Sequence, residues 1–560
     1  MQLRFVRTMG MAMLCTTFAI AGAAHASDLL LVHGRIYTAA QTGEKWAEAI
    51  AITGDHIDAV GSDTDIMKLK TDSTKVVDLQ GKMVVPGFTD DHVHLWFGSL
   101  ALHGFNLSTP ESTIEWNKEP DLFAQKIKEY ADSHPDEEVL IGRAAFSNGV
   151  TSPAPTHEIL DKIVPDRPLV IHATSEHTLW LNEKALELAG ITDRPLPDPS
   201  EEKYVMRDGW GRPTGILREA AMQAMERAIP DPPLDEKLAI FRAGEKYLNS
   251  FGITSVVLAS GGLWDLNSYE QLRERGELTL RMRQSFGQVA VNHHLTPEFL
   301  ADLETARTSY HDDWISADEV KFFMDGAPST PLYTTQQFAH IVGVLDKLGY
   351  HIMTHALAPA SAKVVLDGFE IVEKENGPKD RRFRMEHAGR LYPEDVPRFG
   401  QLGIIASMQP AFCCSAPGQT YGGYPPGKSN QWHSLMAGGA MLEFSSDWPC
   451  SWPPSPILGI QQAVLRRVRR TGTPTGLTGP IESDDEPNEA ITAEQALIAY
   501  TRNAAYVNFT DKKLGTLEAG KLADMVVLSK NILEIPAEEI GTTKVMATMV
   551  DGKVVYGSLE

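Results

Sequence analysis

One apolar stretch that ends in two histidines decides the fold class of this chain. It reads Val84-Val85-Pro86-Gly87-Phe88-Thr89-Asp90-Asp91-His92-Val93-His94. Side chains two residues apart on a strand point to the same side, so His92 and His94 are expected to project together. Imidazole is the commonest metal ligand in proteins, and Asp90 or Asp91 could orient one ring from behind. A His-x-His pair alone is weak evidence for a metal site.

Further apolar runs follow this stretch and alternate with helical patterns. With Met83–Phe88 as the first, the predicted buried strands are Ile253–Leu258, Arg281–Phe286, Glu319–Met324, His351–Thr354, Phe383–Glu386, Ile404–Met408 and Met441–Ser445. Eight buried strands with helical spacers predict an α/β fold, a (β/α)8 TIM barrel over residues 84–510. Because structureless loops are rarely so long, residues of about 100–235 predict an inserted α/β subdomain after the first barrel strand. Strand signals at Val139–Arg143 and Leu169–Ala173 and a helical stretch at Glu183–Ala189 lie inside it.

Both ends of the chain carry short alternating strands of the same character. Residues 27–83 contain several, punctuated by Gly-Asp and Gly-Lys turns, and residues 511–560 contain more, with Asp551-Gly552 as a hairpin signal. The similar texture predicts one small β domain assembled from the two termini.

Four polar residues end or interrupt the predicted barrel strands. They are Lys321, His355, His387 and Asp447. A charge inside an apolar strand is costly unless it is paired or ligating, and active sites of such barrels lie at the carboxyl ends of the strands. Four such residues, together with His92 and His94, favour a catalytic metal site over satisfied core groups.

The chain resembles the amidohydrolase superfamily, in the branch that includes N-substituted formamide deformylase. Besides residues 85–94, the resemblance rests on Trp180-Leu181-Asn182-Glu183-Lys184-Ala185-Leu186, Pro213-Thr214-Gly215-Ile216-Leu217-Arg218-Glu219, Val320-Lys321-Phe322 with Asp325-Gly326, Thr354-His355-Ala356, Arg384-Met385-Glu386-His387-Ala388, Ser445-Ser446-Asp447-Trp448-Pro449 and residues 514–524. It covers essentially the whole chain after residue 26. The resemblance implies a distorted (β/α)8 barrel, a β-sandwich from both termini and an insert that caps the barrel mouth.

The resemblance also implies the members of the site. His92 and His94 would hold a buried metal, His355 and His387 a more exposed one, and Asp447 would be both ligand and general base. The lysine at the position of Lys321 is typically carboxylated and bridges two metals in this branch. Such ligands suit two divalent ions, zinc best, with iron, manganese or cobalt as alternatives. The usual His-Ala-x-Gly-Asp reads His355-Ala356-Leu357-Ala358-Pro359 here, so its aspartate is missing.

These features predict metal-dependent hydrolysis of a C–N amide-type bond, other than a peptide bond, in a small molecule. A hydroxide between the metals would attack the carbonyl, and Asp447 would move the proton. Alternatives on the same site are a lactonase, a carbamate hydrolase or a deaminase, and a catalytically silent binding protein is a third class. His177, Trp96 and Trp448 are predicted to contact the substrate, although His177 on the surface and tryptophans in the core are competing interpretations.

Composition and charge limit the partners and the compartment. The chain of 560 residues carries 51 basic and 74 acidic side chains, a formal net charge of −23, which disfavours nucleic acid and anionic lipid. Arg4 and Arg7, an apolar run and Ala24-His25-Ala26 predict a signal peptide over residues 1–26, cut before Ser27. We therefore expect an exported, periplasmic or secreted protein without a stable membrane anchor. Self-association into a homo-oligomer stays open.

The remaining cysteines and a basic run complete the expectations. Cys413, Cys414 and Cys450 are too few for a disulfide scaffold, so either one bridge from Cys450 or buried thiols are expected. Arg466, Arg467, Arg469 and Arg470 predict one face of a solvated helix.

Overall fold

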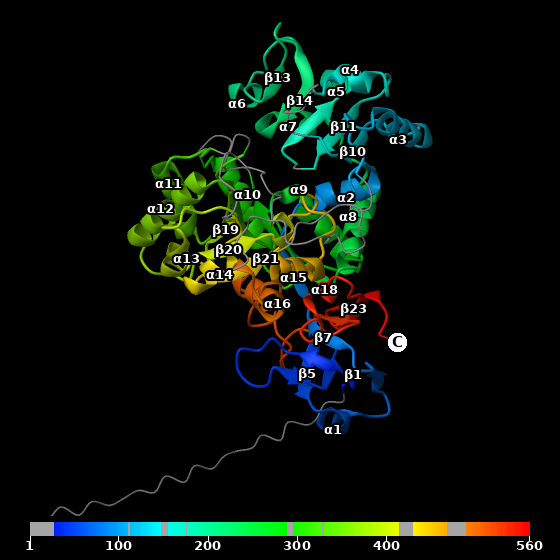
Figure 1. Ribbon diagram of the computed structural model, residues 1–560, viewed down its shortest axis with the longest axis vertical. Helices are drawn as coiled ribbons and strands as arrows, with labels where there is room; N and C mark the ends of the chain where they lie inside the picture. The colour runs from blue at the N-terminus through cyan, green and yellow to red at the C-terminus, as the bar shows by residue number, and fades with distance from the viewer. Residues whose placement is uncertain are drawn as a thin grey trace, which may run out of the picture.

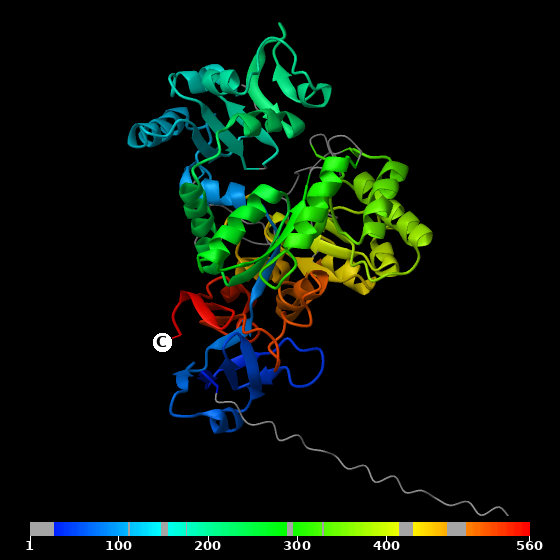
Figure 2. The same ribbon diagram turned by 180° about the vertical axis from the view of Figure 1, so that it is seen from behind.

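The computed structural model describes residues 27–109, 113–146, 155–174, 176–287, 295–326, 330–413, 429–466 and 489–559. The described part forms three bodies along the long axis (Figures 1 and 2): the insert at one end, the barrel in the middle and the sheets of the two termini at the other end. The predicted signal peptide lies outside the described residues.

Two sheets built from the chain ends face each other across an apolar core. The first has the order β5-β4-β1-β6, made of β1 (Leu29–Val32), β4 (Ala49–Thr53), β5 (His56–Gly61) and β6 (Lys75–Asp78). The second has the order β24-β23-β22-β7-β2-β3, made of β2 (Arg35–Tyr37), β3 (Trp46–Ala47), β7 (Met83–Pro86), β22 (Met525–Leu528), β23 (Val545–Val550) and β24 (Lys553–Gly557). Leu31, Ile50, Ile36 and Met525 meet in the core between them. The short helix α1 (Asp63–Ile66) packs against β4 and β5 of the first sheet, and the short helix α18 (Ala537–Ile540) lies between β22 and β23 in the chain.

Eight parallel strands form the barrel, in the order β8-β15-β16-β17-β18-β19-β20-β21. They are β8 (Phe88–Val93), β15 (Ile253–Leu258), β16 (Arg281–Phe286), β17 (Ile315–Phe323), β18 (His351–Ala356), β19 (Arg384–His387), β20 (Ile405–Met408) and β21 (Leu442–Phe444). A parallel bridge between Val93 and Trp448 nearly closes the ring. The predicted α/β barrel is confirmed.

Helices between the barrel strands and after the last one pack on the barrel with their apolar faces. They are α2 (Leu95–His103), α8 (Leu234–Asn249), α9 (Leu263–Glu274), α10 (Pro297–Ser309), α11 (Thr335–Leu348), α12 (Pro359–Asn376), α13 (Val396–Leu402), α14 (Trp432–Ala437), α15 (Pro456–Leu465), α16 (Ala493–Ala499) and α17 (Arg502–Val507). In α11, for example, Phe338, Val342 and Leu345 are buried at helical spacing.

The first predicted barrel strand, Met83–Phe88, is wrong as a single element. The chain breaks at Gly87: β7 pairs with β2 and β22 in the terminal sheet, and only β8 pairs with β15. A Cβ atom on Gly87 would lie 2.2 Å from the Thr254 hydroxyl oxygen, so only glycine lets the chain cross this closely from one sheet to the other. One continuous apolar run therefore serves two sheets.

The insert between β8 and β15 has its own sheet and core. Its strand order is β13-β14-β12-β11-β10-β9, made of β9 (Phe105–Asn106), β10 (Leu140–Ala144), β11 (Leu169–Ala173), β12 (Thr178–Leu181), β13 (Val205–Arg207) and β14 (Pro213–Arg218). Its helices are α3 (Pro120–Ser133), α4 (His157–Asp161), α5 (Glu183–Leu188), α6 (Pro199–Glu202) and α7 (Met222–Ala228). β10, β11 and α5 confirm the strand and helix signals predicted there. The insert lies over one end of the barrel (Figure 1).

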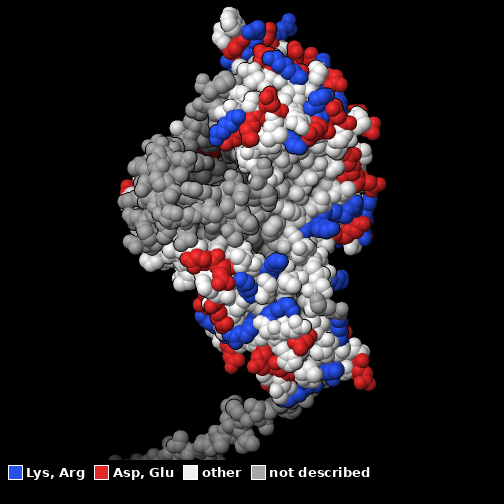
Figure 3. All heavy atoms as spheres, turned by 45° about the vertical axis from the view of Figure 1, so that its right-hand side comes forward, with Lys and Arg blue, Asp and Glu red and all other residues white. Residues whose placement is uncertain are grey.

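The surface of the described part carries charges of both signs (Figure 3). Acidic and basic side chains are interspersed on the face drawn in Figure 3. Among the described helices, none is both long and apolar enough to span a membrane.

The predictions for the arginine run and the cysteines are wrong where the structure tests them. Arg466 is buried and donates to the carbonyl of Asn430 at 2.7 Å, so it is no part of a solvated face; Arg467, Arg469 and Arg470 lie outside the described residues. Cys450 is a thiol and Cys413 is disulfide-bonded, so the predicted bridge from Cys450 is wrong, and so is a buried thiol at Cys413; Cys414 lies outside the described residues.

Candidate metal centre

The six predicted ligand side chains converge at the carboxyl ends of the barrel strands. Four lie on the strands themselves, His92 on β8, Lys321 on β17, His355 on β18 and His387 on β19. His94 directly follows β8, and Asp447 follows β21. Ligand atoms of His92, His387 and Asp447 lie within 4.8 Å of one another. Residues up to 355 positions apart in sequence thus share one small volume.

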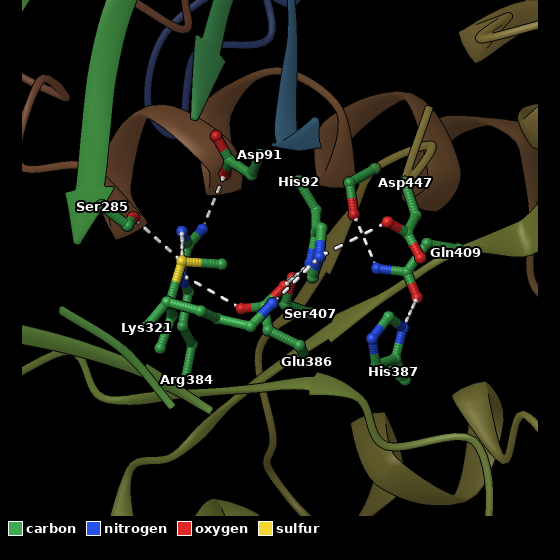
Figure 4. A network of polar contacts seen from close by, with 12 residues as sticks. Asp91, His92, Ser285, Lys321, Arg384, Glu386, His387, Ser407, Gln409 and Asp447 are labelled. Carbon is green, nitrogen blue, oxygen red and sulfur yellow. Dashed lines mark hydrogen bonds and ion pairs between the residues drawn. The ribbon is translucent and has the colours of Figure 1, made fainter. Parts of the chain in front are cut away.

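The Asp447 carboxylate lies at the centre of this group. Its Oδ1 atom is 3.4 Å from Nε2 of His94 and 3.5 Å from Nε2 of His92. Nζ of Lys321 lies 3.0 Å from Nε2 of His92 (Figure 4). The rings of His355 and His387 have centroids 4.4 Å apart, which places the second histidine pair beside the first.

Three of the histidines are held through Nδ1 by a neighbouring side chain. His92 pairs with Glu386 at 2.6 Å, His94 with Ser260 at 2.9 Å and His387 with Gln409 at 2.7 Å. A hydrogen-bond partner on one ring nitrogen fixes the orientation of the ring and leaves the other nitrogen available to bind a metal. This is the arrangement that metal-binding imidazoles need.

The expectation that Asp90 or Asp91 orients a histidine is wrong. The Asp90 carboxylate accepts from the Ser446 amide at 2.8 Å, and Asp91 accepts from Asn508 at 2.5 Å. Glu386 orients His92 instead. Sequence reasoning missed it, although the alternation of Arg384 and Glu386 with apolar neighbours in β19 signals two charges inside the barrel.

Buried charges below the histidines hold Glu386 in turn. Arg384 Nε lies 3.2 Å from a Glu386 oxygen (Figure 4). Arg384 Nη2 donates to Glu319 at 3.0 Å. The Ser407 hydroxyl donates to Glu386 at 2.8 Å. The carboxylate that faces His92 is therefore fixed from two other sides.

Asp325 compensates for the aspartate missing after His355. Its carboxylate accepts from the amides of Leu357 at 3.1 Å and Ala358 at 2.8 Å, and lies 3.0 Å from Nε2 of His355. It thus supports both the histidine and the loop that follows. An aspartate that follows β17 therefore supports His355 in place of the aspartate that usually follows the histidine of β18.

Burial keeps His92, His355 and His387 neutral. It lowers the pKa of His92 far below its usual range, and it lowers the pKa of His387 to about 3, with His355 adding to the effect. Burial also lowers the pKa of Lys321 to about 8. Burial acts to raise the pKa of Asp447, but the side-chain contact with His94 and the electrostatic effects of His387 and Lys321 outweigh it and hold that pKa below its usual range. Neutral imidazoles beside an ionised carboxylate are the protonation states required for metal binding.

The chemistry of these donors fits a divalent metal. Oδ1 of Asp447 is buried and has no hydrogen-bond partner in the described part of the chain. A buried charged oxygen without a partner is costly unless a cation completes it. Imidazole nitrogens and a carboxylate oxygen match the ligand preferences of zinc and its first-row neighbours.

A cavity of about 1400 Å³ opens above the group. Its floor includes His94, His355 and Asp447, and the insert contributes His177 to its wall. His177 pairs with Glu219 at 3.1 Å, and its ring centroid is 6.0 Å from that of His355, so it faces the site rather than the outer surface.

The two predicted tryptophans differ in position. Trp96 lines the cavity beside Trp264, with ring centroids 4.9 Å apart. Trp448 is wholly buried against Tyr247 and Trp452 and does not line the cavity, so the prediction that it contacts substrate is wrong. A Cβ atom on Gly98 would overlap the Trp448 ring, which shows how tightly that ring is packed.

Comparisons with other proteins show the family and the fold of this chain. The model of the amidohydrolase family matches residues 75–556. Protein LONG AFTER FAR-RED 3 of Arabidopsis thaliana is 29% identical, over 95% of this chain and 92% of its own length. N-substituted formamide deformylase of Arthrobacter pascens is 25% identical, over 94% and 98%. The crystal structure of an uncharacterized metal-dependent hydrolase from Pyrococcus horikoshii shares the fold, with a TM-score of 0.69 and 22% identity over 91% of this chain and 99% of that one.

Proposed function

The chain belongs to the amidohydrolase family and is a metal-dependent hydrolase, and from that premise we propose that it hydrolyses the carbon–nitrogen bond of a small amide other than a peptide. The observation that carries the proposal is the Asp447 carboxylate. It is ionised and buried, lacks a hydrogen-bond partner on Oδ1 in the described residues, and lines the cavity beside the imidazoles of His92 and His94.

We propose that His92, His94, His355, His387 and Asp447 hold two divalent ions, zinc by preference and iron, manganese or cobalt as alternatives. Bound divalent ions supply Lewis acidity, which makes a water nucleophilic near neutral pH and polarises a carbonyl oxygen. Lys321 would complete the site as a carbamate: its neutral amine adds to the carbon of CO2 and loses one proton. The product is an anion with two ligand oxygens in place of three donor hydrogens.

Asp447 would carry the proton. Its ionised carboxylate accepts a proton from the attacking water, and the amide carbon becomes tetrahedral. Asp447 then gives the proton to the leaving nitrogen as the C–N bond breaks, so the products are a carboxylic acid and an amine. The low pKa of Asp447 keeps it in the accepting form at the start of each cycle.

The cavity would select small substrates with an apolar group. Trp96, Trp264 and Phe286 line it on the barrel side. Apolar walls with a few convergent polar groups are typical of small-molecule sites. His177, held by Glu219, would contact the substrate from the insert side.

A substrate panel tests the proposal. Protein freed of metal by a chelator and reloaded with zinc or manganese is assayed on N-acyl amines, N-formyl amines, carbamates, lactones and aminated heterocycles, with Asp447→Asn alongside. We expect release of acid and amine from an amide, at least about 10²-fold lower in the variant, as loss of a general base predicts. Ammonia release from a heterocycle, or turnover of lactones or carbamates alone, would identify one of the alternative hydrolases. Metal-free protein that gains neither metal nor hydrolysis would identify a silent binding protein.

We also propose export with removal of residues 1–26. The expected amino terminus of protein recovered from its native host is Ser27, and N-terminal sequencing that returns Met1 would refute this. The proposal includes no nucleic acid partner and no stable membrane anchor, and leaves homo-oligomer formation to a sizing measurement.

A further inference from the structure

The Arg143 side chain joins the insert to the loop that carries Asp447. Arg143 lies on β10 and is only 2% exposed. Its Nη2 donates to the carbonyl of Pro449 at 2.6 Å and to that of Thr174 at 3.0 Å. Its Nε donates to the Glu176 carboxylate at 3.2 Å. One guanidinium therefore contacts both the loop after β11 in the insert and the loop after β21 in the barrel.

Each of these two loops contains a residue in the left-handed backbone region. Asp447 has a φ of 57° and Glu176 a φ of 56°. Residues other than glycine adopt this region at a cost of about 1 kcal/mol or more, and keep it only where surrounding contacts enforce it. The side chains that depend on these conformations are Asp447 itself and His177, the next residue after Glu176.

Two backbone hydrogen bonds tie Asp447 and its neighbour Trp448 to the chain at the end of β8. The Asp447 amide donates to the carbonyl of His92 at 2.8 Å, and the carbonyl of Trp448 accepts from the amide of His94 at 2.8 Å. Both contacts tie the loop to β8. The bond from Arg143 reaches Pro449 from the insert, two residues beyond Asp447, so it restrains the far side of the same turn.

We propose that Arg143 is a positioning residue: it holds the Asp447–Pro449 turn from the insert, and it keeps the Asp447 carboxylate in register with the His177 loop. The role for catalysis rests on the proposed function. The insert would then be a structural part of the metal centre as well as the wall of the cavity.

The geometry requires arginine. The planar guanidinium presents donors in several fixed directions, which the two carbonyls and the carboxylate occupy, whereas a lysine ammonium at the end of a flexible chain cannot keep that arrangement. Removing the side chain would leave buried acceptors at Pro449 and Thr174 without a donor. Glu176 would keep its contact with His172, at 3.1 Å, so the insert loop is expected to move less than the turn at Asp447.

Arg167 provides a matched control. It also lies in the insert and donates to backbone carbonyls, those of Ala131 at 2.7 Å, His134 at 2.7 Å and Glu137 at 3.1 Å. It does not line the cavity. Arg167→Ala should therefore cost stability in the insert and leave the turn at Asp447 unchanged.

The test combines amide hydrogen exchange with kinetics on the full mature chain loaded with zinc. In Arg143→Ala, the amides of Asp447, Trp448, Cys450 and Ser451 should exchange faster than in the wild type, and kcat on the best amide should fall about 10²-fold with a smaller change in KM. In Arg143→Lys, both the exchange rates and kcat should lie between those of the wild type and of Arg143→Ala. This variant provides the test if Arg143→Ala does not fold. Millimolar guanidinium should restore part of kcat in Arg143→Ala. Arg167→Ala should lower Tm without either effect.

Unchanged exchange at residues 447–451 in both Arg143 variants would overturn the proposal, whatever happens to kcat. Equal acceleration there in Arg167→Ala would overturn it as well, since general loosening of the insert would then be the cause. The exchange measurement needs no substrate. If the wild type proves inactive on every amide but exchange rises only in the Arg143 variants, the proposed function fails and the positioning of the turn stands.

Discussion

Nζ of Lys321 lies 3.0 Å from Nε2 of His92, and both side chains are buried. An ammonium group in this place would donate to the ring nitrogen that a metal needs, and would repel a cation. A carbamate would instead present oxygen ligands. Because this distance is short, whether Lys321 is an ammonium or a carbamate determines whether Nε2 of His92 is available to a metal.

Replacing Lys321 tests this directly. Lys321→Ala should lose at least one metal and most activity, and acetate or formate with bicarbonate should restore part of both. Lys321→Arg should not help, because guanidinium stays protonated. Metal analysis and intact mass spectrometry provide the measurements. Lys237→Met, which removes another largely buried lysine, is the control and should keep its metal. Full metal content and normal turnover in Lys321→Ala, with no labile CO2 adduct on the wild type, would leave at best a mononuclear site.

The loading of metal-free protein should depend on pH through the same lysine. Burial lowers the pKa of Lys321 to about 8, so the amine is largely protonated at pH 6.5 and largely neutral at pH 9. Only the neutral amine adds to CO2. At constant dissolved CO2, the initial rate of reactivation by zinc should rise with pH and reach its midpoint near 8. A rate that falls with pH, or that ignores CO2, would contradict carbamate formation.

Glu386 should control metal affinity through His92. Glu386→Gln keeps the shape but weakens the 2.6 Å contact to Nδ1 of His92. Loss of such a partner typically costs about 10–100-fold in metal affinity. Competition with a chelator measures the change. Glu443→Gln is the matched control, because Glu443 is equally buried in β21 but has no contact with a histidine among the described interactions. Equal losses in both variants would point to general destabilisation of the barrel.

Glu245 on α8 should make the stability of the protein depend on pH. Burial raises its pKa to about 8 from an ordinary value of 4.5. The folded state therefore binds the proton more tightly than the unfolded state, and this group's contribution to the free energy of unfolding falls as pH rises from 4.5 to 8. Glu245→Gln cannot ionise, so the difference between its Tm and the wild-type Tm should be more favourable to the variant at pH 8.5 than at pH 5.5. Glu236→Gln, at an exposed position on α8, is the control and should show no such pH-dependent gain in Tm. If the Tm of the wild type and that of Glu245→Gln change equally between pH 5.5 and pH 8.5, Glu245 does not make the stability depend on pH.

The sequence by itself determined the parts that depend on local patterns. The run Ile253–Leu258, for example, predicts a strand with the bounds observed, because a buried parallel strand needs a short, largely apolar run. The parallel arrangement then places every strand end at one face. That is why His92, His355, His387 and Asp447 could be grouped from their positions alone.

Only the tertiary structure decided which groups touch. Glu386 orients His92 across 294 positions of sequence, and Arg143 reaches Pro449 across 306. The continuous run through Gly87 carries no sign that it serves two sheets, and Trp448, next to the proposed ligand Asp447, is buried in the core. Local periodicity specifies whether a residue is buried and on which side of its element it lies. The partner it meets depends on how separate elements pack, and a single sequence carries no local signal for that.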